Sequence, residues 1–445
     1  MERTDITSSS HGNERAEKYI SNDPEDIPVL NSISEKIDGL HPLSNDCCIF
    51  RVPKRLRDVN EKAFTPQIVS IGPFHRGKKH LQVMEKDKLR YLKSFLNRTD
   101  GMSLKSCIRV VKQLEEDARS YYAEIIMLPS DEFVEMILLD SCFIIEVICR
   151  FNDSDFEKQN DYLDKQIFMN DFHQDLILIE NQLPFFVLER IFNLSISSPN
   201  NTTRPFLMLS INYLEANFFV SNREEPFSSG EIKHFVDLLR LCLLPSSLRS
   251  PARCRVKYVP IRTATELREA GMEFWKGSSN CLLDIARRSK GELEIPQLTI
   301  CAWTESFFLN LMALEQFHYL YDSYIIDYIH FMDNLIDTAK DANLLIQRGI
   351  FVNCLGESSA VASLFNKLTP NVTLWSQNYY FCDISIELNN YCNDPCQKWK
   401  ATLRRWKATL GRDYFSTPWS VASTIAAVIL LGLTLTQTIC AIVSL

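Results

Sequence analysis

Apolar residues recur at helical spacing through most of this sequence. Four long runs between residues 80 and 192 place apolar side chains three or four positions apart, which predicts helices. These runs are HLQVMEKDKLRYLKSFLNR (80–98), SLKSCIRVVKQLEEDARSYYAEII (103–126), DEFVEMILLDSCFIIEVICRF (131–151) and DLILIENQLPFFVLERIF (175–192). Two further helical runs cover 305–321 and 323–347. The pattern predicts a mainly α fold, a large helical domain with a few short strands.

The remaining stretches follow other patterns. Residues 1–46 predict a disordered N-terminal segment with one short amphipathic helix, near 29–40. Residues 47–79 contain more proline and β-branched residues, which predicts extended segments and turns. The stretch 195–305 is irregular, with strand candidates at VKYVP (256–260) and LEIPQLTI (293–300). We expect one helical domain over 47–397; a division near 200–260 is the alternative.

The C-terminal tail has a different composition. After Asp413 the chain carries no charged residue, and residues 418–443 form an apolar run longer than the roughly 20 residues that cross a bilayer. We therefore expect a single transmembrane helix within 416–445, with a buried core helix as the alternative. The expected anchor residues are Trp419, Val421, Ile425, Val428, Ile429, Leu430, Leu431, Leu433, Leu435 and Ile439.

The residues before this tail are basic and amphipathic. Segment 398–415 spaces Trp399, Leu403, Trp406 and Leu410 along one helical face. The residues expected at the membrane surface are Lys398, Trp399, Lys400, Arg404, Arg405, Trp406, Lys407 and Arg412. Such a helix suits anionic lipid headgroups, although it can instead pack onto the domain. Basic residues beside a span stay on the cytosolic side. We therefore expect the helical domain, called the body below, to lie in the cytosol. The identity of the membrane is left open.

Composition narrows the possible functions. The 445 residues are 46% hydrophobic and carry a net charge of −8, which favours a substantial core and disfavours nucleic acid as a partner. Fourteen cysteines occur without any C-x-x-C pair, a pattern typical of buried thiols in a reducing compartment.

One stretch resembles a phosphate-binding loop. Gly72, Gly77 and Lys78 in IGPFHRGKKH match G-x-x-x-x-G-K. The loop needs Ser or Thr after the lysine to hold magnesium, and Lys79 stands there. Pro73 also lacks the N–H that such a loop directs at phosphate. We therefore expect no nucleotide.

Two Glu-x-x-His pairs have the spacing found in di-iron bundles. They are Glu231 with His234 and Glu315 with His318, and Glu146 and Glu180 are the further carboxylates that such a site requires. Glutamate is common in this chain, so the matches carry little weight. We assign no metal-binding residue and no cofactor, and leave a metal-binding bundle as an alternative function.

Other carboxylates lie in helical patterns. His330, Asp333, Asp337 and Asp341 fall on one stripe, which predicts a solvent-exposed helical face. Asp140 and Glu146 lie in an apolar run, where a carboxylate is either paired or has a shifted pKa; Arg150 is a possible partner.

No nucleophile or metalloprotease signature accompanies these carboxylates. We assign no catalytic residue, although an enzyme using Asp140, Glu146 or Glu180 stays open as an alternative.

Several blocks together resemble one known family. In order they include CCIFRVPKRLRDVNEKAFTPQIVSIGPFHRG, MILLDSCFIIEVI, DLILIENQLPFFVLERIF, ATELREAGMEF, IPQLTI and NLMALEQ, followed by the C-terminal span. The chain resembles the plant "domain of unknown function 247" family over about residues 30–445. The resemblance implies a plant protein that is mainly helical and held by one C-terminal helix.

The same resemblance bears on function. The family has no established catalytic residues to carry over, and some grass relatives are implicated in pollen-side self-recognition. The resemblance therefore implies protein–protein recognition or signalling. Together with the anchor, it leads us to expect membrane lipid and an unidentified protein as partners.

Overall fold

The computed structural model describes residues 27–38, 47–98, 103–153, 166–195, 204–218, 229–245, 258–370, 372–373, 379–395 and 418–443. The chain divides into two units, Met1–Asn45 and Asp46–Leu445. The described residues of the first unit form helix α1, Ile27–Asp38. This confirms the short helix expected near 29–40.

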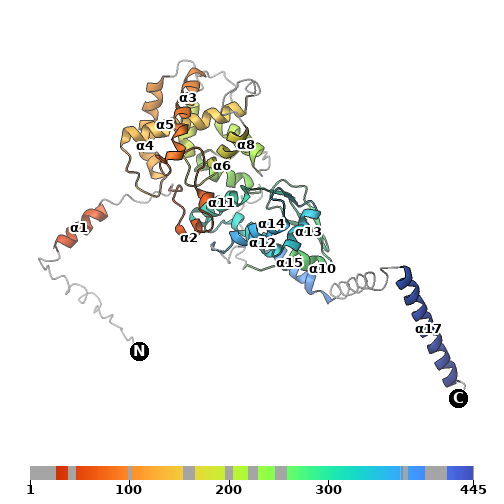
Figure 1. Ribbon diagram of the computed structural model, residues 1–445. Coiled ribbons are helices and arrows are strands. Elements are labelled where there is room, and N and C mark those ends of the chain that lie inside the picture. Colours follow the sequence, from red (N-terminus) through yellow and green to blue (C-terminus); the bar gives the residue numbers. More distant parts are fainter. Residues whose placement is uncertain are drawn as a thin grey trace, which may run out of the picture. The chain divides into compact units, whose positions relative to one another are not determined.

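The second unit is mainly helical in its described residues, which confirms the expected fold class (Figure 1). Its α-helices are α2 Lys54–Arg57, α3 Val83–Arg98, α4 Leu104–Ser120, α5 Ser130–Phe151, α6 Gln166–Leu176, α7 Phe185–Leu194, α8 Phe206–Asn217, α9 Phe235–Leu243, α10 Ala264–Glu269, α11 Thr304–His318, α12 Tyr324–Leu335, α13 Ala339–Gln347, α14 Ser358–Leu368, α15 Cys382–Asn393 and α17 Pro418–Val443. The 3-10 helices are η2 Glu61–Phe64, η3 Lys79–Leu81 and η6 Ser229–Glu231. The strands are β1 Glu273–Lys276, β2 Ala286–Ser289, β3 Glu292–Ile295, β4 Leu298–Ile300 and β5 Phe351–Asn353.

Helix α5 is the central element of the N-terminal half of this unit. Residues 136–148 are buried without interruption, because the helix is apolar on every side and a helix of that kind belongs in a core. Helices α3, α4, α7 and α8 pack against it, and Figure 1 shows α3 and α4 beside it. Asp140 and Glu146 are therefore carried into the interior.

Helix α11 has the same role in the C-terminal half. Residues 307–315 are buried throughout, and α9, α12 and α14 pack around them. The 3-10 helix η2 also contacts α11, so a short helix near the start of the second unit reaches this part of the core.

Two short sheets lie between α10 and α14 in the sequence. In the first, β3 pairs in parallel with β1 and antiparallel with β2. In the second, β4 pairs in parallel with β5. The predicted strand LEIPQLTI is confirmed as two strands, β3 and β4, because Pro296 between them cannot donate to a ladder.

The helix predicted over 175–192 is wrong in its middle. Helix α6 ends at Leu176 and α7 begins at Phe185, and residues 177–184 form a connecting turn. Pro184 cannot continue a helix and restricts the residue before it. The Gln182 amide donates to the carbonyl of Leu176, the last residue of α6, at 2.6 Å and to the Leu178 carbonyl within the turn at 2.9 Å, which satisfies backbone acceptors that the end of the helix leaves open.

The exposed stripe predicted at His330, Asp333, Asp337 and Asp341 is only partly correct, because Asp337 is exposed but the four residues do not share one helix. The run 323–347 breaks into α12 and α13, because Thr338 and Asp341 form a capping box that starts α13. Asp341 is buried and also accepts the Thr265 N–H at 2.8 Å. His330 is half-buried, and burial lowers its pKa to about 4.

The expectation of an irregular stretch over 195–305 is only partly correct. Helices α8 and α9 lie inside it and are mostly buried, so their apolar residues did contain a signal. The strand candidate VKYVP forms no strand in its described part, Tyr258–Pro260.

Helix α17 confirms a long apolar helix at the C-terminal end. Residues 425–442 are long and apolar enough to cross a membrane, and none of that window is buried within the chain. The alternative of a buried core helix is therefore wrong for these residues. The predicted anchor residues all lie on α17, whereas the predicted membrane-surface segment 398–415 lies outside the described residues.

Candidate functional site

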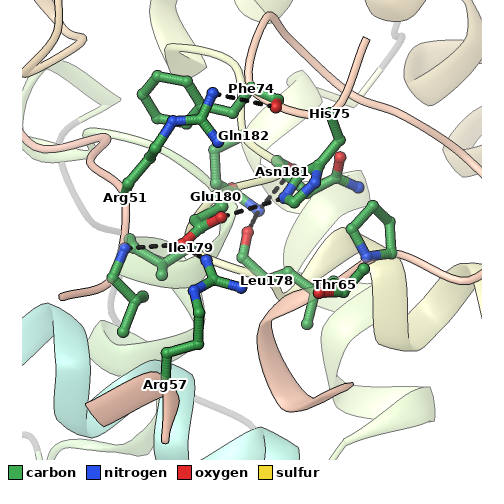
Figure 2. A network of polar contacts seen from close by, with 12 residues as sticks. Arg51, Arg57, Thr65, Phe74, His75, Leu178, Ile179, Glu180, Asn181 and Gln182 are labelled. Carbon is green, nitrogen blue, oxygen red and sulfur yellow. Dashed lines mark hydrogen bonds and ion pairs between the residues drawn. The ribbon is translucent and has the colours of Figure 1, made fainter. Parts of the chain in front are cut away.

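A network of polar contacts joins the N-terminal segment, residues 47–82, to the turn 177–184 (Figure 2). The N-terminal segment has little regular structure; beyond short helices, its described residues include one isolated bridge, between Ile49 and Tyr122. Its backbone N–H and C=O groups therefore need partners elsewhere, because buried backbone polar groups are costly when unsatisfied. The turn and its neighbours supply those partners.

Glu180 lies at the centre of this network, with a side chain that is 0% exposed. Its Oε1 accepts the Val52 N–H at 2.7 Å and pairs with Arg57. Its Oε2 lies 3.3 Å from Nε2 of His75. Figure 2 shows these groups converging on one carboxylate from separate parts of the N-terminal segment. We call Val52, Arg57, His75 and Glu180 the Glu180 cluster.

The electrostatics of the Glu180 cluster favour a charged carboxylate and a neutral imidazole. Burial alone would raise the pKa of Glu180, but the contacts with His75, Val52 and Arg57 outweigh it and hold that pKa below its usual value. Burial lowers the pKa of His75, with Glu180 opposing the shift. At neutral pH the cluster is therefore one partly buried ion pair, between buried Glu180 and half-buried Arg57, beside an uncharged His75.

Asn181 in the turn and Asp175 in α6 bind the backbone of residues 67–71. Asn181 accepts the Ile71 N–H at 2.7 Å and donates to the Val69 carbonyl at 3.1 Å. Asp175 accepts three consecutive N–H groups, those of residues 67, 68 and 69, at 2.8–2.9 Å. Burial raises the pKa of Asp175 to about 7, against the effect of these three donors. The backbone of residues 67–71 is thus held by the side chains of Asp175 and Asn181.

The G-x-x-x-x-G-K stretch is part of the same packing. The Gly72 N–H donates to Oδ2 of Asp140 at 2.8 Å, and Oδ1 of Asp140 pairs with Lys88 at 2.5 Å. Lys88 also donates to the Ser70 carbonyl at 2.6 Å. The N–H groups of Ile71 and Gly72 are therefore occupied by side-chain oxygens of the protein and do not surround a phosphate.

Gly72 is also required for steric reasons. Its φ is +71°, and a Cβ at this position would lie 2.7 Å from the Gln182 carbonyl oxygen. The Tyr122 hydroxyl donates to that same oxygen at 3.1 Å. The N-terminal segment and the turn approach each other here more closely than any side chain allows.

Among the described residues, no three His, Cys, Asp or Glu side chains are grouped so that they could hold a metal ion. Two of the residues nominated for a di-iron site, Glu315 and His234, have other partners. Glu315 pairs with Arg240 at 2.8 Å and accepts the Ile325 and Ile326 N–H groups. His234 caps α9 by accepting the Asp237 N–H, and burial lowers its pKa to about 4.

The carboxylates nominated for catalysis are engaged in ion pairs. Glu146 pairs with Arg98 at 3.1 Å and with Arg150 at 3.2 Å, so the expected partner Arg150 is confirmed. Asp140 and Glu180 pair with Lys88 and Arg57. Each carboxylate is thus paired with at least one cation of its own. These pairs hold different pieces of backbone or helix in place, so the charges stabilise the fold.

The sequence contained a weak signal for this site. Glu180, Asn181 and Gln182 are three consecutive polar residues within an apolar run, followed closely by Pro184. Polar residues in such a position are buried only when they have partners. Glu180 was nominated as a possible ligand or catalytic residue, but its actual partners were not foreseen.

Substitution of Gly72 by alanine tests the close approach at the turn, with Gly77→Ala as the matched control. Both glycines have positive φ, +71° and +84°, but a Cβ at Gly77 meets nothing within 4 Å. We expect Gly77→Ala to lower the free energy of unfolding by about 1–2 kcal/mol through backbone strain alone. Gly72→Ala should cost at least about 2 kcal/mol more, because the segment must move away from the turn.

Denaturant unfolding of the purified proteins in detergent measures both changes. Equal losses in the two variants would show that the close approach at Gly72 does not contribute to stability.

Comparison with known proteins places the chain in a family. The model of DUF247, described as a plant protein of unknown function, matches residues 49–433. UPF0481 protein At3g47200 of Arabidopsis thaliana is 29% identical over 426 residues, which cover 89% of this chain and 87% of that protein. Putative UPF0481 protein At3g02645 of the same plant is 21% identical, with 86% and 88% covered. No solved structure matches. The resemblance noted in the sequence is thus confirmed, and the chain belongs to the DUF247 family of plant proteins of unknown function.

Proposed function

We propose that this protein is a membrane-anchored module whose helical body binds other proteins in recognition or signalling. The observation that carries the proposal is α17, a 26-residue apolar helix whose described side chains are all exposed. An apolar helix of that length, not buried within the chain, is stable when it is surrounded by lipid. The anchor would hold the body at a membrane, where it can meet a partner.

The orientation follows from the charges before the helix. Six cations between Lys398 and Arg412 precede an uncharged tail, and basic flanks remain on the cytosolic side. The described cysteines are free thiols, which is consistent with a reducing compartment. We therefore propose that the body lies in the cytosol.

Binding is a better account of the body than catalysis. In the described part of the body, the buried carboxylates nominated for chemistry are each paired with a cation and fix the fold. A catalytic site needs polar groups that converge on a substrate, whereas these groups converge on backbone and on one another. The large core of the body instead supports a fixed outer surface, to which a partner can bind.

Membrane insertion is tested by extraction of cell membranes with alkaline carbonate. We expect the full-length protein to stay with the membrane pellet. The double variant Leu430→Arg and Leu433→Arg should be released, because each arginine near the centre of a span costs about 2.5–3.5 kcal/mol. An arginine at the exposed Gln113 of α4 is the control and should leave the protein in the pellet. Release of the wild-type protein by carbonate would rule out the anchor.

Partner binding is tested by quantitative co-purification from detergent-solubilised plant membranes. The control is residues 418–443 fused to an inert soluble protein, which keeps the anchor and lacks the body. We expect at least one protein to be enriched with the full chain, to survive stringent washing, and to be absent with the anchor alone. If the same proteins follow both baits in repeated experiments, the body is not a recognition module.

A further inference from the structure

Gln437 is unusual among the polar residues of α17. The hydroxyls of Thr434, Thr436 and Thr438 each donate to the carbonyl four residues earlier, at 2.7–2.8 Å. The one donor of each hydroxyl is thus used within the helix. The Gln437 side chain is exposed, and no hydrogen bond of its amide is found in the part of the chain that the structure describes.

The Gln437 amide has no hydrogen-bond partner among the described residues when α17 is a single helix surrounded by lipid. The 26 residues of α17 span about 39 Å, which exceeds the roughly 30 Å hydrocarbon layer. Gln437 precedes the last helical residue, Val443, by six positions, or about 9 Å. A helix centred in the bilayer extends about 4–5 Å past the apolar layer at each end, so Gln437 lies inside that layer. An amide without a partner there is costly, because no water is available to replace the missing bonds.

The residues on the same face as Gln437 favour close contact with another helix. Positions 423, 427, 430, 434, 437 and 441 alternate steps of four and three, the 3.5-residue period of a left-handed helix pair. Ser423, Ala427 and Ala441 on this face are small, which lets two backbones approach. The amide therefore lies on a face with small residues at which a second helix can pack closely.

We propose that two copies of this chain associate in the bilayer through α17, with their Gln437 amides hydrogen-bonded to each other. A carboxamide carries both donors and an acceptor, so two identical amides related by a twofold axis satisfy each other. The proposal rests on the membrane insertion proposed above, since only the loss of water makes the pairing favourable.

The chemistry of the face argues for a second copy rather than a charged foreign helix. No charged residue occurs from Tyr414 to Leu445, so α17 offers no opposite charge that would select a span carrying Asp, Glu, Lys or Arg. A neutral amide is self-complementary, and an identical chain inserted in the same orientation places its own Gln437 amide at the same depth.

The test uses the full-length chain reconstituted in phosphatidylcholine vesicles, with donor and acceptor fluorophores fused to the N-terminus. We expect energy transfer that falls when unlabelled wild-type protein is added. Gln437→Leu keeps the span apolar and removes the amide, and should weaken association about 3- to 30-fold. Gln437→Asn keeps a shorter amide and should restore part of it.

The matched control is Thr436→Leu. This residue is adjacent in sequence, but its hydroxyl is bonded to the Gly432 carbonyl and it lies outside the Gln437 face. We expect its association to equal that of the wild type. Wild-type protein that is monomeric in these vesicles, or Gln437→Leu protein that associates as strongly as wild type, would overturn the proposal.

Carbonate extraction of the same vesicles separates the two proposals. If the wild-type chain resists extraction but shows no energy transfer, self-association fails and the anchor stands. If the chain is extracted, the anchor and the helix pairing both fail.

Discussion

The described fold depends on one buried charge being neutralised where two distant parts of the chain meet. A carboxylate in a protein interior is tolerated only when a cation and hydrogen-bond donors compensate its lost hydration. For Glu180 these are Arg57 and the Val52 N–H, with His75 beside them. The N-terminal segment must therefore lie against the turn 177–184, and its irregular backbone is then held by Asn181 and Asp175.

The same use of charge recurs through the body. Asp140 with Lys88, Glu146 with Arg150, and Glu315 with Arg240 are buried or largely buried pairs that tie elements together. Such pairs add less net stability than an apolar core but are costly to break, so they favour one arrangement of the chain over others. The polar chemistry of the described interior is thereby used for architecture. The proposals of partner binding and helix pairing start from two other parts of the chain, the surface of the body and α17.

The sequence predicted the helices better than it predicted their ends or their partners. Periodicity alone identified α3, α4, α5 and α11, because their buried faces repeat at helical spacing. It extended α7 back across the turn 177–184 to the last residues of α6, and it joined α12 to α13, because the breaks depend on a proline with side-chain amides in one case and on a capping box in the other. The Glu180 cluster was out of reach for a different reason. Val52 lies 128 residues before Glu180, and no local pattern states which distant groups will meet.

A double-mutant cycle on Arg57 and Glu180 measures the central claim most directly. Denaturant unfolding would compare wild type, Arg57→Met, Glu180→Gln and the double variant, with Glu116→Gln at the exposed face of α4 as a control for loss of a carboxylate. Arg57→Met leaves a buried carboxylate without its cation and should cost about 3–5 kcal/mol. The coupling energy between the two sites should be about 1–3 kcal/mol. A coupling below about 0.5 kcal/mol, with Glu180→Gln as harmless as Glu116→Gln, would contradict the account.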